Sequence, residues 1–143
     1  MIHALPKRRT RIVFGLFAVA CGMAGCADLA PRFCPAGLKD ITQAELFFGR
    51  DIPTGGMVTD RDWQSFLDEE VTPRFSDGLT VEDASGQWRD RNGIVREASK
   101  RLTIVLSGAS GEQAKLSEVR QAYKARFKQN SVLILEYRVC GSF

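Results

Sequence analysis

Residues 79–106, LTVEDASGQWRDRNGIVREASKRLTIVL, contain the stretch that decides the fold. Asn92-Gly93 is the pair most typical of a tight β-hairpin, because both residues tolerate the positive φ angles that such a turn requires. Apolar residues alternate with polar ones most clearly in residues 101–106, as expected for a strand with one buried face. We therefore predict an antiparallel hairpin of two strands, residues 79–89 and 94–106.

One amphipathic helix is predicted on each side of this hairpin. Thr59-x-x-Asp62 resembles a capping box, in which each residue's side chain accepts a hydrogen bond from the other's backbone, and Pro73 ends the helix that it opens. Ser110-x-x-Gln113 is predicted to cap the second helix in the same way. The apolar stripes of the two helices consist of Trp63, Phe66, Leu67 and Val71, and of Leu116, Val119, Tyr123 and Phe127.

Two further strands, residues 41–49 and 132–139, complete the predicted elements. The order β-α-β-β-α-β is that of the ferredoxin-like split βαβ pattern. We therefore predict an α+β fold with a four-stranded antiparallel sheet and two helices on one face. It forms a single domain that covers residues 41–143.

Two cysteines lie near opposite ends of this domain. In the predicted topology the last strand runs antiparallel beside the first, so Cys140 comes close to Cys34. Two thiols in an oxidising compartment usually pair. A disulfide that closes a loop of about 100 residues stabilises a fold by roughly 4.7 kcal/mol in the chain-entropy model. We therefore predict a structural disulfide rather than a redox centre.

Residues 1–25 have the features of a secretory signal. Basic residues precede an uncharged run, Ile12–Gly25, which is shorter than the roughly 20 residues of a membrane-spanning helix. Met23-Ala24-Gly25-Cys26 then resembles the lipobox of bacterial lipoproteins. By that resemblance, Cys26 becomes the acylated N-terminus after cleavage, and residues 26–40 form a tether.

An acyl anchor implies a location in the cell envelope. We expect the membrane to be a partner through Cys26, and Ala27 after it favours the outer membrane, facing the periplasm, by analogy with lipoproteins. Two alternatives stay open. One is cleavage before Cys21, and the other is an ordinary signal peptide that leaves Cys26 as a free thiol.

Charge and composition exclude several function classes. The chain has 20 Lys and Arg against 17 Asp and Glu, but the leader holds four of the basic residues, so the mature protein has no electrostatic basis for binding nucleic acid. The single histidine, His3, also lies in the leader. Its loss removes Ser-His and Cys-His nucleophile pairs and imidazole ligands. We predict no catalytic residue, no metal site and no cofactor.

Several ordered segments together resemble a known bacterial family, the domain of unknown function 3574, often found as small secreted lipoproteins. The likeness covers about residues 45–140 and implies no activity and no catalytic residue. The segments that carry it are Glu45–Arg50, Val71–Phe75, Asp77–Val81, Gly86–Arg89, Arg96–Lys100 and Ala122–Phe127.

The hairpin arms hold a candidate ligand site. Trp88, Arg96, Glu97 and Lys100 could bind an anionic or aromatic ligand by stacking and charge-assisted hydrogen bonds. Glu97 could act as a general base if it were desolvated, and Arg50 before Gly55-Gly56 could hold a phosphate or carboxylate. The alternative is that Trp88 covers the core while the charges keep an exposed hairpin soluble.

The sheet face away from the helices holds a second candidate site. If Leu46, Leu102 and Leu133 point to the helices, this open face presents a mixture of apolar and charged side chains. It would then be either a solvated cross-strand network or the interface of a homodimer anchored by Phe47. The residues that we assign to this face are Glu45, Phe47, Arg101 and Arg138.

Three functions from different classes follow from these sites. The first is a lipid-anchored, non-catalytic interaction or structural module of the cell envelope, with an unknown protein partner. The second is a periplasmic binding module for a small, perhaps anionic, ligand. The third is a hydrolase or isomerase without histidine that uses Glu97.

Overall fold

The computed structural model describes residues 34–89, 91 and 93–142. The predicted leader, the lipidation site at Cys26 and the turn residue Asn92 lie outside these residues. The helices among these residues lack the length and the apolar character of a membrane span. The elements are β1 (Lys39–Gly49), α1 (Asp60–Phe66), a π-helical turn η1 (Leu67–Val71), β2 (Leu79–Arg89), β3 (Ile94–Leu106), α2 (Glu112–Phe127) and β4 (Leu133–Gly141).

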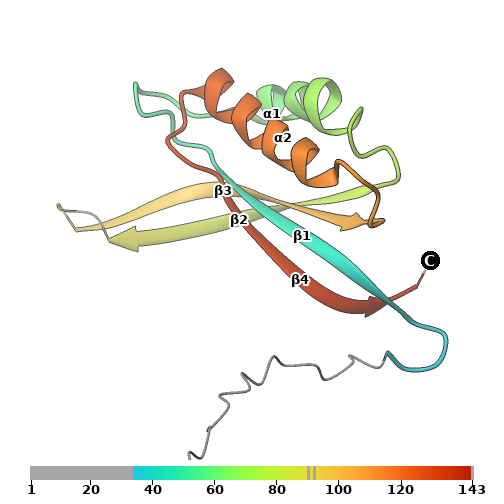
Figure 1. Ribbon diagram of the computed structural model, residues 1–143. Helices are drawn as coiled ribbons and strands as arrows, with labels where there is room; N and C mark the ends of the chain where they lie inside the picture. Colours follow the sequence, from blue (N-terminus) through green and yellow to red (C-terminus); the bar gives the residue numbers. More distant parts are fainter. Residues whose placement is uncertain (1–33, 90, 92, 143) are drawn as a thin grey trace, which may run out of the picture. The chain divides into compact units, whose positions relative to one another are not determined.

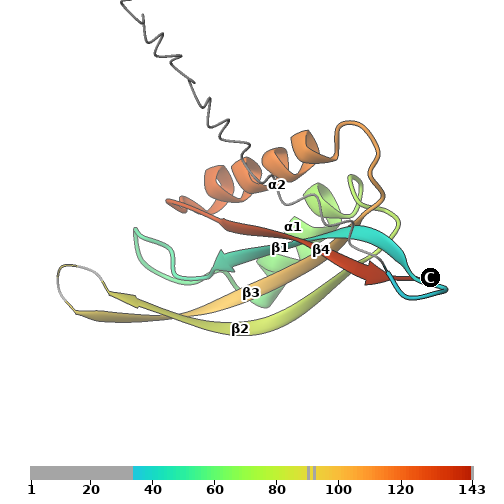
Figure 2. The same ribbon diagram turned by 60° about the horizontal axis from the view of Figure 1, so that its bottom comes forward.

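The four strands form one antiparallel sheet in the order β2-β3-β1-β4. Both helices cover the same face of the sheet, and the other face is open (Figure 1). The predicted α+β class, with an open four-stranded antiparallel sheet and two helices, is therefore confirmed. The two strands of the β2–β3 hairpin have the predicted bounds and extend beyond the end of β1 (Figures 1 and 2).

Strands β1 and β4 extend further than predicted at the end where they pair with each other. β1 begins at Lys39 and β4 continues to Gly141, because these two residues still pair with each other at the end of the ladder. Interstrand hydrogen bonds define these ends, and the apolar pattern of the sequence does not report them.

The two predicted helix caps have different outcomes. Thr59 and Asp62 form the predicted capping box, with backbone N–H donors 3.1 Å from the side-chain oxygens in both directions. The second box is wrong. Gly111, at φ +90°, is the N-cap of α2 and offers no side chain. The Glu112 carboxylate instead accepts hydrogen bonds from the backbone N–H groups of Ser107 and Gly108, so it fixes the preceding loop.

The core lies between the helices and the covered face of the sheet. Both predicted apolar stripes are buried there. At its centre, the rings of Phe48, Trp63, Phe66 and Tyr123 contact one another, with centroids 4.7 to 6.0 Å apart. Edge-on contacts of this kind add to the stabilisation from burial. The core therefore holds α2 firmly against β1.

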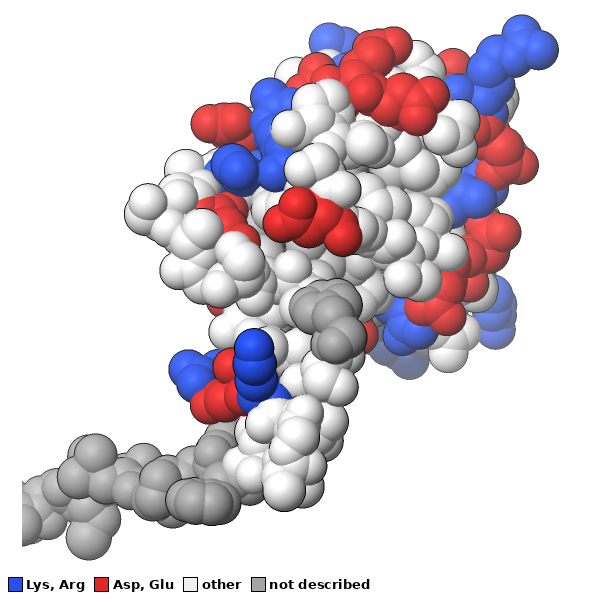
Figure 3. Space-filling model, turned by 90° about the vertical axis from the view of Figure 1, so that its right-hand side faces the viewer, with Lys and Arg blue, Asp and Glu red and all other residues white. Residues whose placement is uncertain are grey.

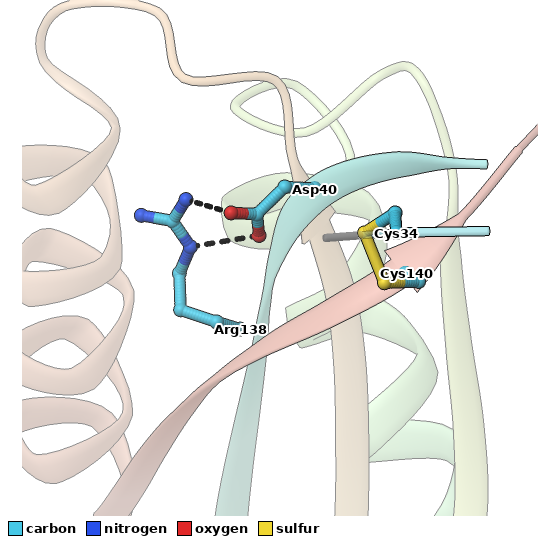
Figure 4. Close-up of a disulfide and its surroundings, with 4 residues drawn as sticks. All are labelled: Cys34, Asp40, Arg138 and Cys140. Atoms are coloured by element: carbon cyan, nitrogen blue, oxygen red, sulfur yellow. Dashed lines mark hydrogen bonds and ion pairs between the residues drawn. A yellow bond between two sulfur atoms is a disulfide. The ribbon is translucent and has the colours of Figure 1, made fainter. Parts of the chain in front are cut away.

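The predicted disulfide between Cys34 and Cys140 is present, with the Cα atoms 5.5 Å apart. It joins the segment before β1 to the end of β4. Asp40 and Arg138 face each other next to it, as Figure 4 shows, and Arg138 Nε donates to Asp40 Oδ1 at 2.9 Å. A covalent bond and an ion pair thus hold together the outer end of the β1–β4 pair.

Candidate functional site

A hollow of about 720 Å³ opens where β1 ends and the hairpin continues alone. Its floor is the open face of the hairpin, on which Trp88 pairs with Val95, and Gly86 pairs with Glu97. Directly paired residues of antiparallel strands point to the same face. We call this hollow the Glu97 pocket. Its lining is Phe47, Gly49, Asp51, Ile52, Pro53, Ala84, Ser85, Gly86, Gln87, Trp88, Val95, Glu97, Ser99, Gln129, Asn130, Ser131 and Leu133.

Two loops form walls of the Glu97 pocket. One follows β1 at residues 51–53, and the other follows α2 at residues 129–131. The side chain of Gln129 joins them, because its Nε2 donates to the backbone carbonyl of Asp51 at 2.7 Å. Phe47 and Leu133, paired across β1 and β4, line the pocket from the sheet.

The carboxylate of Glu97 occupies space that a side chain at position 49 would need. A Cβ atom built on Gly49 would overlap with Glu97 Oε1. That oxygen accepts a hydrogen bond from the backbone N–H of Asp51 at 2.8 Å. Glu97 is therefore fixed against the end of β1 by one oxygen. Its other oxygen makes no hydrogen bond to the part of the chain that the structure describes.

The pocket wall perturbs the titration of Glu97. Burial raises the pKa of this carboxyl, the hydrogen bond from the Asp51 backbone opposes the shift, and the charge of the Asp51 carboxylate adds to it. Among the described lining residues, Asp51 and Glu97 are acidic and none is Lys or Arg. The pocket is therefore an apolar and aromatic hollow with an incompletely solvated carboxylate.

Tyr123 connects this site to the core. Its hydroxyl donates to the carbonyl of Gly49 at 2.8 Å. Burial, followed by the nearby charge of Glu97, raises the pKa of Tyr123 far above its ordinary value. Tyr123 is thus a neutral donor that holds the end of β1 in place, and with it the residue against which Glu97 rests.

The structure brings together two of the five predicted ligand-binding residues. Trp88 and Glu97 both line the Glu97 pocket. Trp88 is 46% exposed and lies on the open face, so the expectation that it covers the core is wrong. Arg96 and Lys100 lie on the opposite face of β3, because they are one and three positions away from Glu97 and successive side chains of a strand point to opposite faces.

Arg50 and Lys100 belong to an ion cluster on the helix-covered side. Lys100 Nζ lies 2.9 Å from Asp60 and 2.5 Å from Asp83, and Arg50 donates to the carbonyl of Val58 and lies 3.2 Å from Asp60. The hydrogen bond from Lys100, followed by the charge of Arg50, lowers the pKa of Asp60. These cations have carboxylate partners and do not face the pocket, so the predicted group of five is not a single anion site.

The predicted dimer face needs a similar correction. Glu45, Phe47 and Arg101 lie on the open face, where Arg101 Nε donates to Glu82 at 2.9 Å across β3 and β2. Arg138 does not lie there, because it pairs with Thr42, on the face of β1 that the helices cover. The same register places Leu133 opposite Phe47, so Leu133 points away from the helices and is 55% exposed.

Several residues of the open face were missed in the sequence. Leu135 and Tyr137 are exposed and continue the row that Leu133 begins along β4. Their spacing two residues apart indicates that they share one face of the strand with Leu133, but not which face it is. For Gly49, Asp51 and Gln129 the sequence held no signal, because the end of β1 and the loop after α2 that bring them together are distant in sequence. No group of three metal-binding side chains occurs among residues 34–89, 91 and 93–142.

Acidic and basic side chains are interspersed on the side of the molecule drawn in Figure 3.

A family model described as "Protein of unknown function (DUF3574)" matches residues 43–143. The chain belongs to this family. The match covers all of the secondary structure except the start of β1. No curated protein sequence matches the chain.

Three solved structures have a similar fold. A phage SAM lyase in complex with S-methyl-5'-thioadenosine has a TM-score of 0.55 and 21% identity, covering 68% of this chain and 81% of that chain. A phage SAM lyase in the apo state has a TM-score of 0.54 and 18% identity, covering 72% of this chain and 86% of that chain. CutA from Synechococcus elongatus PCC7942 has a TM-score of 0.50 and 12% identity, covering 75% of this chain and 87% of that chain. At these identities the likeness shows the fold alone.

Proposed function

We propose that this member of the family is a cell-envelope protein that binds a small ligand in the Glu97 pocket. The observation that carries the proposal is the hollow of about 720 Å³, within the roughly 300–1,000 Å³ typical of ligand sites. Its lining combines aromatic and apolar surface with a few polar groups, as such sites do. Of the three functions considered from the sequence, the geometry favours the binding module.

The lining changes the expected ligand. The sequence suggested an anionic or aromatic ligand, whereas the charged side chains of the described lining, Asp51 and Glu97, are both acidic. An anion would meet repulsion there without a compensating cation. We therefore propose a ligand with an apolar or aromatic body that stacks on Trp88 and a polar group that faces Glu97.

The setting of the domain is part of the proposal. We propose a lipoprotein, anchored through acylated Cys26, exported as directed by residues 1–25 and facing the periplasm from the outer membrane. We also propose that the single domain over residues 41–143 has the ferredoxin-like split topology. The element order and the sheet order β2-β3-β1-β4 support that topology.

The test of ligand binding is native mass spectrometry of the full chain after gentle purification in detergent. We expect a bound species of small-molecule mass that is lost or greatly reduced in Trp88→Ala. Ile94→Ala is the matched control, because Ile94 is equally exposed but lies on the opposite face of the same hairpin. An added mass that both variants retain, or a wild type with none, would contradict the proposal.

The test of the anchor is membrane fractionation. Globomycin, which inhibits the lipoprotein signal peptidase, should make the precursor accumulate. Cys26→Ser should release the protein from membranes, whereas Cys21→Ser should not. A Cys26→Ser protein that still sediments with membranes without an acyl chain would contradict lipid anchoring.

The row of exposed apolar side chains on β4 favours a second candidate, an interaction module that docks through the open face. Leu133, Leu135 and Tyr137 are each more than a third exposed, and Phe47 adjoins them. In a homodimer through this face, Leu135→Glu should give monomers by light scattering, and Glu136→Gln, on the other face, should not. A wild type that is monomeric at high concentration would exclude the homodimer.

A further inference from the structure

We infer that the Glu97 pocket selects organic cations, in which a methylated onium group is attached to a flat apolar body. This inference rests on the proposed function and adds the class of ligand. Three features of the pocket lead to it: the charge of the lining, its aromatic surface and the cost of covering Glu97.

The charge of the lining has one sign. Glu97 uses Oε1 to accept a hydrogen bond from the Asp51 backbone, and Oε2 makes no hydrogen bond to the described residues. The nearby cations Arg50 and Lys100 are on the other side of the sheet, where Asp60 holds both. Nothing in the described lining therefore neutralises Glu97, and a positively charged ligand group would do so.

The aromatic surface suits a cation that cannot donate hydrogen bonds. Trp88 lines the pocket and is nearly half exposed, and Phe47 also lines it. An onium group above an aromatic face gains about 0.5–2 kcal/mol, with tryptophan the best partner. Methyl groups around the charge also make apolar contacts, which matches a lining with Ile52, Pro53 and Val95.

The cost of covering Glu97 argues against a purely apolar ligand. The carboxyl lies against the end of β1 and is already partly desolvated by the pocket wall, which raises its pKa. A neutral ligand that filled the pocket would remove more water from it and supply no replacement, which is unfavourable for a charged group. A cation instead offsets the desolvation. The same carboxylate thus repels anions, disfavours neutral apolar molecules and attracts cations.

The inference is tested with two probes of the same shape. Para-hydroxyphenyl-trimethylammonium carries a positive nitrogen where para-tert-butylphenol carries a neutral carbon. Each probe is titrated into the full chain, and the fluorescence of Trp88 reports binding. The Trp88→Phe variant gives the fluorescence of the buried Trp63 alone, which is then subtracted. We expect the cation to bind at least about tenfold more tightly, given the size of the cation–π and ion-pair contributions.

Glu97→Gln distinguishes the charge from the shape of the pocket, because glutamine can still accept the hydrogen bond from Asp51. In this variant we expect the preference for the cation to fall to about threefold or less, the part due to aromatic contact. Glu82→Gln, on the open face outside the described lining, is the control and should keep the full preference.

Each other outcome would overturn the inference. If both probes bind equally, the pocket binds ligands but does not select cations, and the proposed function stands. If Glu97→Gln keeps the preference, Glu97 is not the partner of the charge. If neither probe binds, the ligand class is wrong, and native mass spectrometry decides separately whether the protein binds a ligand at all.

Discussion

At the scale of single residues, the site depends on the absence of a side chain at Gly49. The space above this residue is taken by the Glu97 carboxylate. Across the hairpin Gly86 pairs with Glu97, and it also leaves the pocket floor open. Two glycines thus determine where one carboxylate lies and how much room remains beside it.

Gly49→Ala should move Glu97 without unfolding the protein. The new Cβ would meet the end of a flexible side chain, so Glu97 turns away and gives up the hydrogen bond from Asp51, at a cost of about 0.5–1.5 kcal/mol. We expect a large change in the Asp51 amide signal by NMR. Gly86→Ala is the control, because its Cβ would lie 3.6 Å from the nearest atom, Ser99 Oγ. Equal changes in both variants would contradict this account.

Glu97→Gln should change how stability depends on pH. The raised pKa of Glu97 means that the folded protein holds this proton more tightly than the unfolded chain. Stability is therefore lost as the pH rises from the ordinary glutamate pKa through the raised one. The variant lacks that loss, so its free energy of unfolding relative to the wild type should rise through this window and stay constant above it, and the two proteins should converge in acid.

Chemical denaturation at a series of pH values measures this difference. Glu69→Gln should show the opposite sign, because the hydrogen bond from Ser65, followed by that from Arg126, lowers the pKa of Glu69. Its destabilisation relative to the wild type should be present above the ordinary glutamate pKa and vanish as the pH falls through the lowered one. A pH-independent difference for Glu97→Gln would contradict the assignment.

At the scale of elements, the two helix N-termini show what a short motif can predict. Both Thr59-x-x-Asp62 and Ser110-x-x-Gln113 fit the spacing of a capping box. The second fails because Gly111 adopts the left-handed conformation and starts α2 one residue later. A spacing rule cannot detect this, since it depends on how the loop approaches the helix.

Thr59→Ala should therefore destabilise the protein by about 1 kcal/mol. The Asp62 backbone N–H loses its acceptor, which lies 3.1 Å away in the wild type. Ser110→Ala removes a residue of the same kind at the predicted second cap and should change the stability by less than about 0.5 kcal/mol. Urea denaturation measures both. A comparable loss in Ser110→Ala would mean that it caps α2 after all.

The strands show why the faces of β4 could not be assigned from the sequence. Residues 132–135, Val-Leu-Ile-Leu, are apolar on both faces, so period-two alternation does not choose between them. Pairing with β1 decides the matter and turns Leu133 outward. In β3, by contrast, the strand period alone places Arg96 and Lys100 on the face opposite to Glu97. The predicted ligand site combined the three residues because they are close in sequence.

At the scale of the whole molecule, the fold was predictable and the pocket was only partly so. The hairpin, the helix stripes and the cysteine pair are local or topological features that one sequence contains. The pocket walls come from loops after β1 and after α2, which Gln129 joins to Asp51. Such a contact across the molecule leaves no local pattern, so the sequence identified the floor of the pocket and not its walls.

The disulfide is the strongest prediction about the whole molecule. Cys34→Ser/Cys140→Ser should lower the free energy of unfolding by about 2–4 kcal/mol, because the unfolded chain loses a long covalent loop. Reduction of the disulfide in the wild type should lower the melting temperature to about that of the double variant. Arg138→Gln is the control for the neighbouring ion pair, and as an exposed pair it should cost at most about 1 kcal/mol. Free thiols in protein isolated from the periplasm would contradict the predicted bond.

The central claim is that the pocket at the end of β1 binds a ligand, and amide NMR of the full chain tests it most directly. Either phenolic probe is added until binding saturates, and the shifted amides are placed on the structure. The account predicts that the largest shifts occur at Gly49, Asp51 and Glu97, around the pocket. Shifts concentrated on α1 and α2, or spread evenly over the sheet, would contradict it.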